Sequence, residues 1–101
     1  MTITIGNKTI ASIHFSDVET AWKIENAMDV FDYFKKMNCI ILGGDILDEH
    51  LEYTYDNWYY NPKSDLDMQT NIDCSVRVAK EYISKYQQRN GNRFYVVIVV
   101  E

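Results

Sequence analysis

The chain has 101 residues, of which 47% are hydrophobic and 14% aromatic, so it holds enough apolar material for the core of one domain and has little room for a second. Fifteen acidic residues against ten basic ones give a formal net charge of −5, which disfavours binding to nucleic acid and to anionic lipid. No apolar stretch approaches the roughly 20 residues of a membrane span, and the first residues lack the basic and hydrophobic parts of a signal peptide. We expect one domain over residues 1–101, located in the cytoplasm.

The amino-terminal residues predict a β-hairpin. Ile3 and Ile5 alternate with threonines, and Gly6-Asn7 is a two-residue turn signal. Apolar residues then return at every second or third position over residues 9–15. Two short strands joined by a tight turn satisfy this pattern.

Residues 16–25 fit two different structures. Ser16 followed by Glu19 has the spacing of a capping box, which marks the start of a helix. Trp22 and Ile24, in contrast, alternate as in a strand. The sequence leaves this segment open.

A first helix is predicted to begin after Asn26, which has the residue type of a helix cap and is followed by Asp29. Acidic residues early in the segment and basic residues late, at Lys35 and Lys36, complement the helix dipole. The apolar residues recur on one stripe at helical spacing: Ala27, Val30, Phe31, Phe34 and Met37.

A buried strand is predicted over residues 39–42, a short apolar run that ends at a glycine pair. Gly43 and Gly44 allow the positive φ angles of a turn, and the Asp45 side chain can accept backbone hydrogen bonds within it. We therefore assign a structural role to Gly43, Gly44 and Asp45.

Residues 45–62 show no clean period, so we expect mostly loop with a short strand. Leu51, Tyr53 and Tyr55 alternate briefly, and Asn61-Pro62 has the composition of a turn. Asp56 and Asn57 could cap a turn beneath Trp58.

A second helix and a last strand complete the predicted elements. The helix has apolar residues at three- and four-residue spacing, namely Ile72, Val76, Ala79, Ile83 and Tyr86, and it ends at Asn90-Gly91. Residues 94–100 are apolar at almost every position, which indicates a central strand or one covered on both faces. These elements predict an α+β fold: a small mixed sheet with two main helices packed on it in a single layered domain.

The negative charge is concentrated in one part of the sequence. Residues 45–73 contain eight acids and one base, Lys63, for a net charge of −7, whereas the rest of the chain has seven acids and nine bases. A basic protein surface is the partner that such a segment favours.

The same segment holds five of the fourteen aromatic residues within eight positions: Tyr53, Tyr55, Trp58, Tyr59 and Tyr60. Tyrosine and tryptophan dominate the energetics of protein interfaces, but they also build the cores of small domains. We expect Trp58 to be core. Tyr59 and Tyr60 point to opposite faces if extended, so at least one should be exposed.

Three motifs in fixed order resemble one family. They are Gly-Gly-Asp-Ile-Leu at residues 43–47, Tyr-Asp-Asn-Trp-Tyr at 55–59 and Ala-Lys-Glu-Tyr-Ile at 79–83. Together they look like the immunity protein 40 family of bacterial polymorphic toxin systems, with the resemblance covering roughly residues 26–100. It implies a small intracellular protein that protects its cell by binding the toxin encoded by a neighbouring gene.

Charge and aromatic content then select the candidate toxin-binding residues: Asp48, Glu49, Glu52, Asp56, Asn57, Tyr59 and Tyr60. Gly43, Gly44, Asp45 and Trp58 form the candidate structural motif. We predict a toxin-neutralising protein, with no nucleic-acid or membrane partner.

Two other classes of function remain open. Asp45, Asp48 and His50 could form a metal-dependent catalytic cluster, but their spacing matches no known ligand pattern. The aromatic segment could instead form the pocket of a small-molecule or adaptor module. The sequence lacks a phosphate-binding loop and a nucleophile elbow, so we predict no cofactor and no enzymatic activity. We expect both cysteines, Cys39 and Cys74, to be small buried hydrophobic residues.

Overall fold

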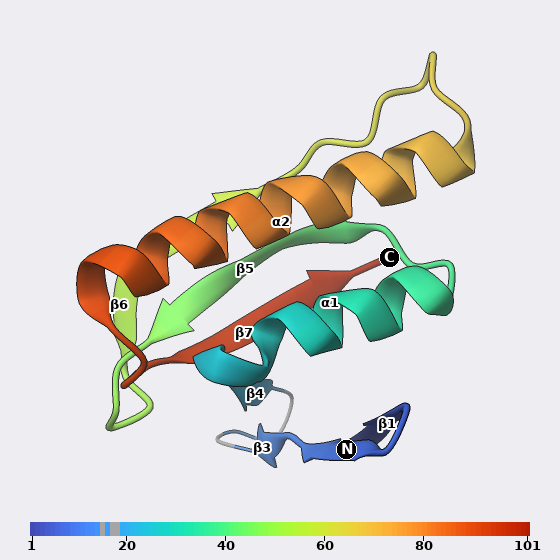
Figure 1. The fold of residues 1–101 in the computed structure, drawn as a ribbon. Coiled ribbons are helices and arrows are strands. Elements are labelled where there is room, and N and C mark those ends of the chain that lie inside the picture. The colour runs from blue at the N-terminus through green and yellow to red at the C-terminus, as the bar shows by residue number, and fades with distance from the viewer. Residues whose placement is uncertain (15, 17–18) are drawn as a thin grey trace.

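The computed structural model of the protein describes residues 1–14, 16 and 19–101. A five-stranded sheet carries two helices on one face, and a separate hairpin lies beside the first helix (Figure 1). The helices are α1 (Ala27–Lys36) and α2 (Met68–Asn90). The strands are β1 (Thr2–Ile5), β2 (Lys8–Ala11), β3 (Ile13–His14), β4 (Thr20–Lys23), β5 (Ile41–Leu47), β6 (Tyr53–Tyr59) and β7 (Tyr95–Val100).

The large sheet has the strand order β3-β4-β7-β5-β6, and each pairing between its described residues is antiparallel. The predicted α+β class with two helices on a sheet is confirmed, but the sheet is not mixed. Strands β4 and β5, which α1 connects, run in the same direction, yet β7 lies between them. In the same way β5 lies between β6 and β7, which α2 connects. Interleaving of these two β-α-β units makes every neighbour antiparallel.

Strands β1 and β2 form the predicted amino-terminal hairpin, with Gly6 at φ 58° in its turn. Ile3 and Ile10 pack with Trp22 of β4 and Val30 of α1, which places the hairpin against the helix. The predicted apolar period extended to Phe15, which lies outside the described residues.

The segment before α1, which fitted either a helix or a strand, shows the capping-box contact and also forms a strand. The Glu19 backbone N–H donates to the Ser16 hydroxyl at 3.0 Å, which is the capping-box contact, but no helix follows it. The chain instead forms β4 and then one turn of 3-10 helix, Ile24–Asn26.

The first helix begins after Asn26, as predicted, but the Asn26 side chain does not cap it. Asn26 ends the 3-10 turn with φ −100° and ψ −4°, so its backbone is already helical and its side chain makes no capping hydrogen bond. The apolar stripe of α1 is buried at Ala27, Val30 and Phe31, whereas Met37 lies after the helix and is exposed. The stripe therefore ends one turn earlier than its spacing suggests.

The predicted turn at the glycine pair is also wrong, because β5 continues through Gly43, Gly44 and Asp45 to Leu47. A Cβ atom on Gly44 would lie 2.3 Å from the Val97 carbonyl oxygen and 2.5 Å from Cη2 of Trp58. Gly43 has φ 151°, and a Cβ there would lie 2.3 Å from the Trp58 carbonyl oxygen. Both glycines are structural, as expected, but they serve the close approach of three strands rather than a turn.

Trp58 fills the space above Gly44 and is core, as predicted, with 6% of its surface exposed. Its indole stacks on Tyr82 of α2 with ring centroids 5.2 Å apart, and it meets Phe31 of α1 edge-on at 5.9 Å. Its Nε1 has no hydrogen-bond partner among the described residues. Aromatic packing therefore holds the ring, and through it β6 and both helices.

Strand β6 replaces most of the predicted loop. Asn57 pairs with Asp45 and Tyr53 pairs with Leu47, so one residue of β5 faces three residues of β6 between these pairs. This bulge over residues 54–56 breaks the alternation that would have shown a seven-residue strand in the sequence. The expected turn at Asn61-Pro62 forms later, over residues 63–66.

The second predicted helix and its end at Asn90-Gly91 are confirmed, with Gly91 at φ 85°. At its start, Asp67 accepts the Thr70 backbone N–H at 2.7 Å, and hydrogen bonding from Thr70 lowers the pKa of Asp67. About two turns from the start of the helix, the buried Ser75 hydroxyl accepts the Ile41 N–H at 2.9 Å, which fixes the helix to β5.

Asn71 holds the connection before α2 in place. Its side-chain oxygen accepts the Tyr60 hydroxyl at 2.7 Å and the Lys63 N–H at 2.9 Å, and its side-chain nitrogen donates to the Lys63 carbonyl at 3.0 Å. A buried amide with its hydrogen bonds satisfied in this way can specify one conformation of the loop.

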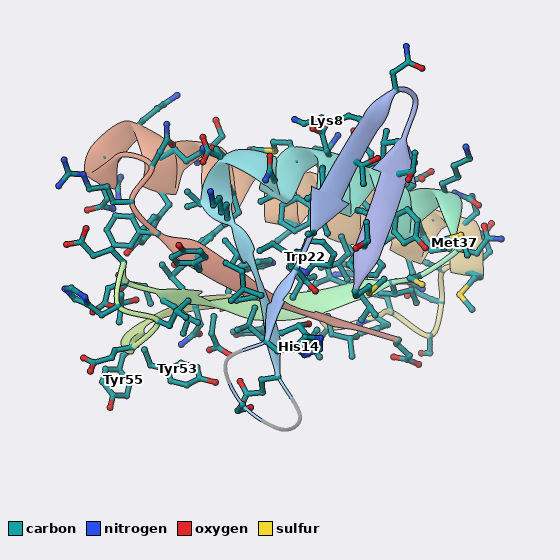
Figure 2. All side chains as sticks on the ribbon, turned by 90° about the horizontal axis from the view of Figure 1, so that it is seen from below. Lys8, His14, Trp22, Met37, Tyr53 and Tyr55 are labelled. Atoms are coloured by element: carbon teal, nitrogen blue, oxygen red, sulfur yellow. The ribbon has the colours of Figure 1, made fainter. Side chains whose placement is uncertain are left out.

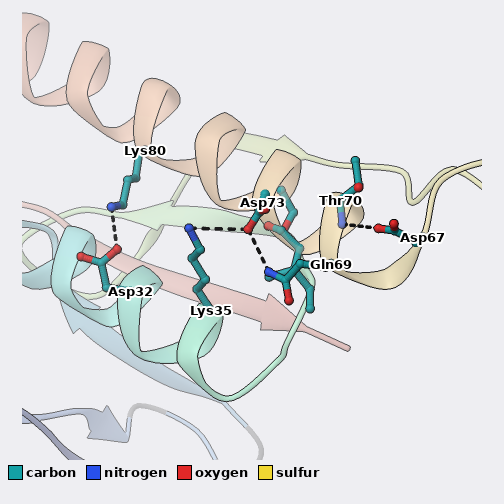
Figure 3. Close-up of polar contacts among 9 residues, drawn as sticks. Asp32, Lys35, Asp67, Gln69, Thr70, Asp73 and Lys80 are labelled. Carbon is teal, nitrogen blue, oxygen red and sulfur yellow. Dashed lines mark hydrogen bonds and ion pairs between the residues drawn. The ribbon is translucent and has the colours of Figure 1, made fainter.

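Two exposed ion pairs join α1 to α2 (Figure 3). Lys80 lies 2.6 Å from Asp32, and Lys35 lies 3.5 Å from Asp73. Because their side chains are between about a third and a half exposed, these pairs contribute little stability compared with the apolar contacts beneath them.

Strand β7 occupies the centre of the sheet, as its apolar sequence predicted, although Val99 remains exposed. The prediction that both cysteines are buried is wrong, because Cys39 and Cys74 are only half-buried. Among the described residues, no helix is long and apolar enough to span a membrane.

Gly44→Ala tests the close approach of the strands. The added methyl meets a backbone oxygen that no side-chain rotation can move, so we expect the free energy of unfolding to fall by about 2 kcal/mol or more in urea denaturation. Gly6→Ala is the control, since its turn has open space and only the positive φ costs about 1 kcal/mol. Equal losses in the two variants would contradict the packing explanation.

Asn71→Ala should lower the melting temperature strongly. The change removes the partners of the Tyr60 hydroxyl and the Lys63 N–H, and each such unsatisfied group costs about 1–3 kcal/mol when buried. Asn61→Ala, at an exposed asparagine of the same connection, should leave the melting temperature nearly unchanged. Similar melting temperatures for both variants would remove Asn71 from this role.

Candidate functional site

The sheet has one face that the helices do not occupy. Both helices lie on the opposite side, and Figure 2 shows Tyr53 and Tyr55 projecting away from them. We call this surface the open face and define it by six residues of β5, β6 and β7: Asp45, Tyr53, Asn57, Tyr59, Val97 and Val99. An antiparallel sheet with one side in water usually carries polar residues there, so the exposed tyrosines and Val99 mark this face for contact with another molecule, whereas Val97 is buried beside Ala21 and Leu47.

Strand pairing arranges the open face in cross-strand rows. Tyr59, Gly43 and Val99 form one row, because Gly43 pairs with both of the others. Asn57, Asp45 and Val97 form the next row through the same two ladders. The sheet thus brings together residues that lie more than fifty positions apart in the sequence.

Two hollows lie on this face. One of about 240 Å³ is lined by Gly43, Asp45, Asn57, Tyr59 and Val99, among others. The second, of about 500 Å³, has Asp45, Tyr53, Val99 and Glu19 in its lining. Asp45 and Val99 belong to both, so the hollows adjoin.

Tyr53 is tied to the residue that directly precedes β4. Its hydroxyl donates a short hydrogen bond to the Glu19 carboxylate. That bond, with burial as the second cause, raises the pKa of Tyr53 to about 12. The phenol, which is neutral at physiological pH in any case, donates this hydrogen bond, and Tyr53 lines the second hollow.

The bulge in β6 displays one more tyrosine. Tyr55 has φ 71°, which is unusual for a bulky residue, and 87% of its surface is exposed. The Thr54 hydroxyl donates to the Ile46 carbonyl at 2.9 Å, and the Asn57 amide donates to the Tyr55 carbonyl at 3.2 Å. These bonds offset part of the cost of the strained backbone.

Asp56 is turned by the same bulge toward α2. Its carboxylate accepts the Tyr86 hydroxyl at 2.9 Å. Burial and this hydrogen bond raise the pKa of Tyr86 to about 12. Asp56 thus has a structural partner, whereas Asn57 and Tyr59 lie on the open face.

The predicted acidic residues fall into different places. Asp48 holds the turn between β5 and β6, because its Oδ1 accepts the backbone N–H groups of His50 at 2.8 Å and Glu52 at 3.1 Å. Glu49 and Glu52 are exposed on this turn, and Glu49 lines a hollow together with Lys23 and Arg93. Of the three acids of this turn, Asp48 has one carboxylate oxygen engaged with the backbone, whereas Glu49 and Glu52 are exposed.

The negative segment also does not form one patch. Its last acids, Asp67 and Asp73, lie at the start of α2, where Asp67 caps the helix and Asp73 pairs with Lys35. Residues 45–73 run across the length of the molecule (Figure 1), so their negative charge is spread over several surfaces and no single surface carries all of it.

Tyr60 must be removed from the predicted toxin-binding set. Its ring is 9% exposed and its hydroxyl is bound to Asn71. Tyr59 is 73% exposed, so the prediction that at least one of the two tyrosines is exposed is confirmed. Strand alternation places their rings on opposite faces.

The proposed metal cluster at Asp45, Asp48 and His50 does not assemble. Among the described residues, no group of three His, Cys, Asp or Glu side chains is placed to hold a metal ion. The Asp48 carboxylate is engaged in its turn, and Asp45 faces the sheet surface.

Sequence inspection missed Tyr53, Val97, Val99 and Asp45 as members of one surface. The signal lay in the alternation of Tyr95, Val97 and Val99 along β7, but both faces of that strand are apolar, so the exposed side could not be told from the buried one.

Comparison with known proteins gives one match. The family model of immunity protein 40 matches residues 9–100. No curated protein and no solved structure matched the chain. Because the match covers nearly the whole chain and includes the elements that build the open face, the protein belongs to the immunity protein 40 family.

Proposed function

We propose that this protein binds and neutralises one cognate toxin, encoded by a neighbouring gene, in the cytoplasm of the producing cell. Its family membership supports the general role of an immunity protein. The observation that carries the proposal further is the open face, where exposed tyrosines and a valine lie beside carboxylates on a rigid sheet.

The composition of this face suits protein recognition. Tyr59 is 73% and Val99 47% exposed, although large apolar side chains favour burial. Tyrosine contributes a large contact area at a small entropy cost, and such residues at the centre of an interface carry much of its binding energy. The sheet beneath them is fixed by Trp58, so little ordering is needed on binding.

Charge favours a basic toxin surface. Asp45 lies within the open face, and Glu49 and Glu52 are exposed on the adjoining turn. Long-range attraction from exposed acids accelerates encounter, while the buried aromatic contacts determine how long the complex lasts.

Tyr59→Ala tests the interface. Because the ring is exposed, we expect an unchanged melting temperature but binding to the neighbouring toxin weakened by about 2 kcal/mol or more in calorimetry. Co-expression with the toxin should show reduced protection of growth. Met68→Ala, which changes another large exposed side chain at the start of α2, is the matched control and should bind normally.

The outcomes separate the candidate functions. Binding that is lost equally in the Tyr59 and Met68 variants would argue against the open face as the interface. Absence of any complex between the wild-type protein and the neighbouring toxin would overturn the neutralisation proposal and favour a small-molecule or adaptor role.

Neutralising the exposed acids of the turn should slow association. For the double variant Glu49→Gln/Glu52→Gln we expect the association rate to fall about threefold or more at low salt, with little change in dissociation, because the charges steer rather than anchor. Surface plasmon resonance measures both rates. The control Asp65→Asn/Glu81→Gln removes the same charge away from the open face and should associate at the wild-type rate.

A further inference from the structure

The two hollows of the open face are organised around one carboxylate. Asp45 lies in the linings of both, midway along β5 between the ladders to β6 and β7. Its side chain makes no hydrogen bond or ion pair with any described residue, in contrast to the side chains of Asp48, Asp56, Asp67 and Asp73, each of which has a partner.

The charge lining these hollows has one sign. Of the described residues that form them, the charged ones are Asp45 and Glu19, and none is basic. The Glu19 carboxylate accepts a hydrogen bond from the Tyr53 hydroxyl. This bond does not neutralise the carboxylate, which lies beside the second hollow. The negative charge of this site therefore favours binding of a cation.

Apolar and aromatic surfaces surround the carboxylate. Gly43 contributes no side chain, so the row between Tyr59 and Val99 is left hollow. The exposed Val99 offers contact for an aliphatic stem, and each hollow has a tyrosine in its lining, Tyr59 in one and Tyr53 in the other, that can contact a cation. This combination of charge, aliphatic surface and aromatic rings matches the side chains of arginine and lysine.

We propose that the hollow centred on Asp45 binds one arginine or lysine side chain of the toxin, with its charged group on the Asp45 carboxylate and its stem on Val99. This proposal rests on the proposed function for the identity of the partner. The chemistry of the pocket does not depend on it, so the pocket can be tested without the toxin.

The direct test is a titration of the ¹⁵N-labelled full chain, followed by amide chemical shifts in NMR spectra. The probes are N-acetyl-arginine methylamide and N-acetyl-lysine methylamide, and N-acetyl-citrulline methylamide is the neutral analogue of the first. We expect saturable shifts at Gly43, Asp45, Tyr59 and Val99 with at least one cationic probe and none with citrulline. The stronger of the two cationic probes identifies which side chain the pocket prefers.

Asp45→Asn removes the charge while preserving the shape of the side chain. It should weaken binding of the cationic probe about fivefold or more, whereas Asp65→Asn, with the same loss of charge outside the hollows, should leave it unchanged. Tyr59→Leu provides a second variant that keeps apolar bulk but removes the ring, and it should also weaken binding. Wild-type-like spectra away from the site confirm that each variant is folded.

The proposal is overturned if neither cationic probe shifts these amides, if citrulline shifts them equally, or if binding survives in both variants. These results would leave the effect of Tyr59→Ala on the toxin complex untouched, since that experiment measures a whole interface. Conversely, failure of the toxin to bind would leave the probe titration valid. The two proposals therefore fail in different ways.

Discussion

The close contact between the Trp58 indole and Gly44 is the constraint on which the rest of the structure depends. A residue with a side chain at position 44 would push the ring out of the core or separate β5 from β7. With the ring in place, Phe31 and Tyr82 bring both helices onto the same side of the sheet. Because successive side chains of a strand point to opposite faces, burial of Trp58 places its neighbours Asn57 and Tyr59 on the face away from the helices. A core contact thus determines which residues are displayed.

Periodicity predicted the parts of this fold that are locally encoded. The spacing of Ile72, Val76, Ala79 and Ile83 gave the second helix and its buried stripe, because helical geometry brings such residues to one side whatever they pack against. The apolar run at residues 94–100 likewise indicated a central strand. Trp58 was assigned to the core by its residue type, and the amino-terminal hairpin by its turn.

Periodicity and residue type could not predict the elements that depend on residues distant in the sequence. A glycine pair permits a turn and also permits close packing, and only the positions of Trp58 and Val97 decide between them. The bulge in β6 concealed a strand by shifting its alternation, and residue type alone did not separate the buried Tyr60 from the exposed Tyr59. The open face combines three strands that meet only in the folded chain, so its site was visible in the sequence as charge and aromatic content but not as a surface.

The position of β7 also has a consequence for how the protein forms. This strand supplies the ladder that joins β4 to β5, and among the described residues no other ladder links the β3-β4 pair to the β5-β6 pair. β7 (residues 95–100) follows the other described strands along the chain, so during synthesis the two halves of the sheet stay unpaired until this strand has been made. The row of Tyr59, Gly43 and Val99 forms only when β7 pairs with β5, and a nascent chain without β7 has no such surface.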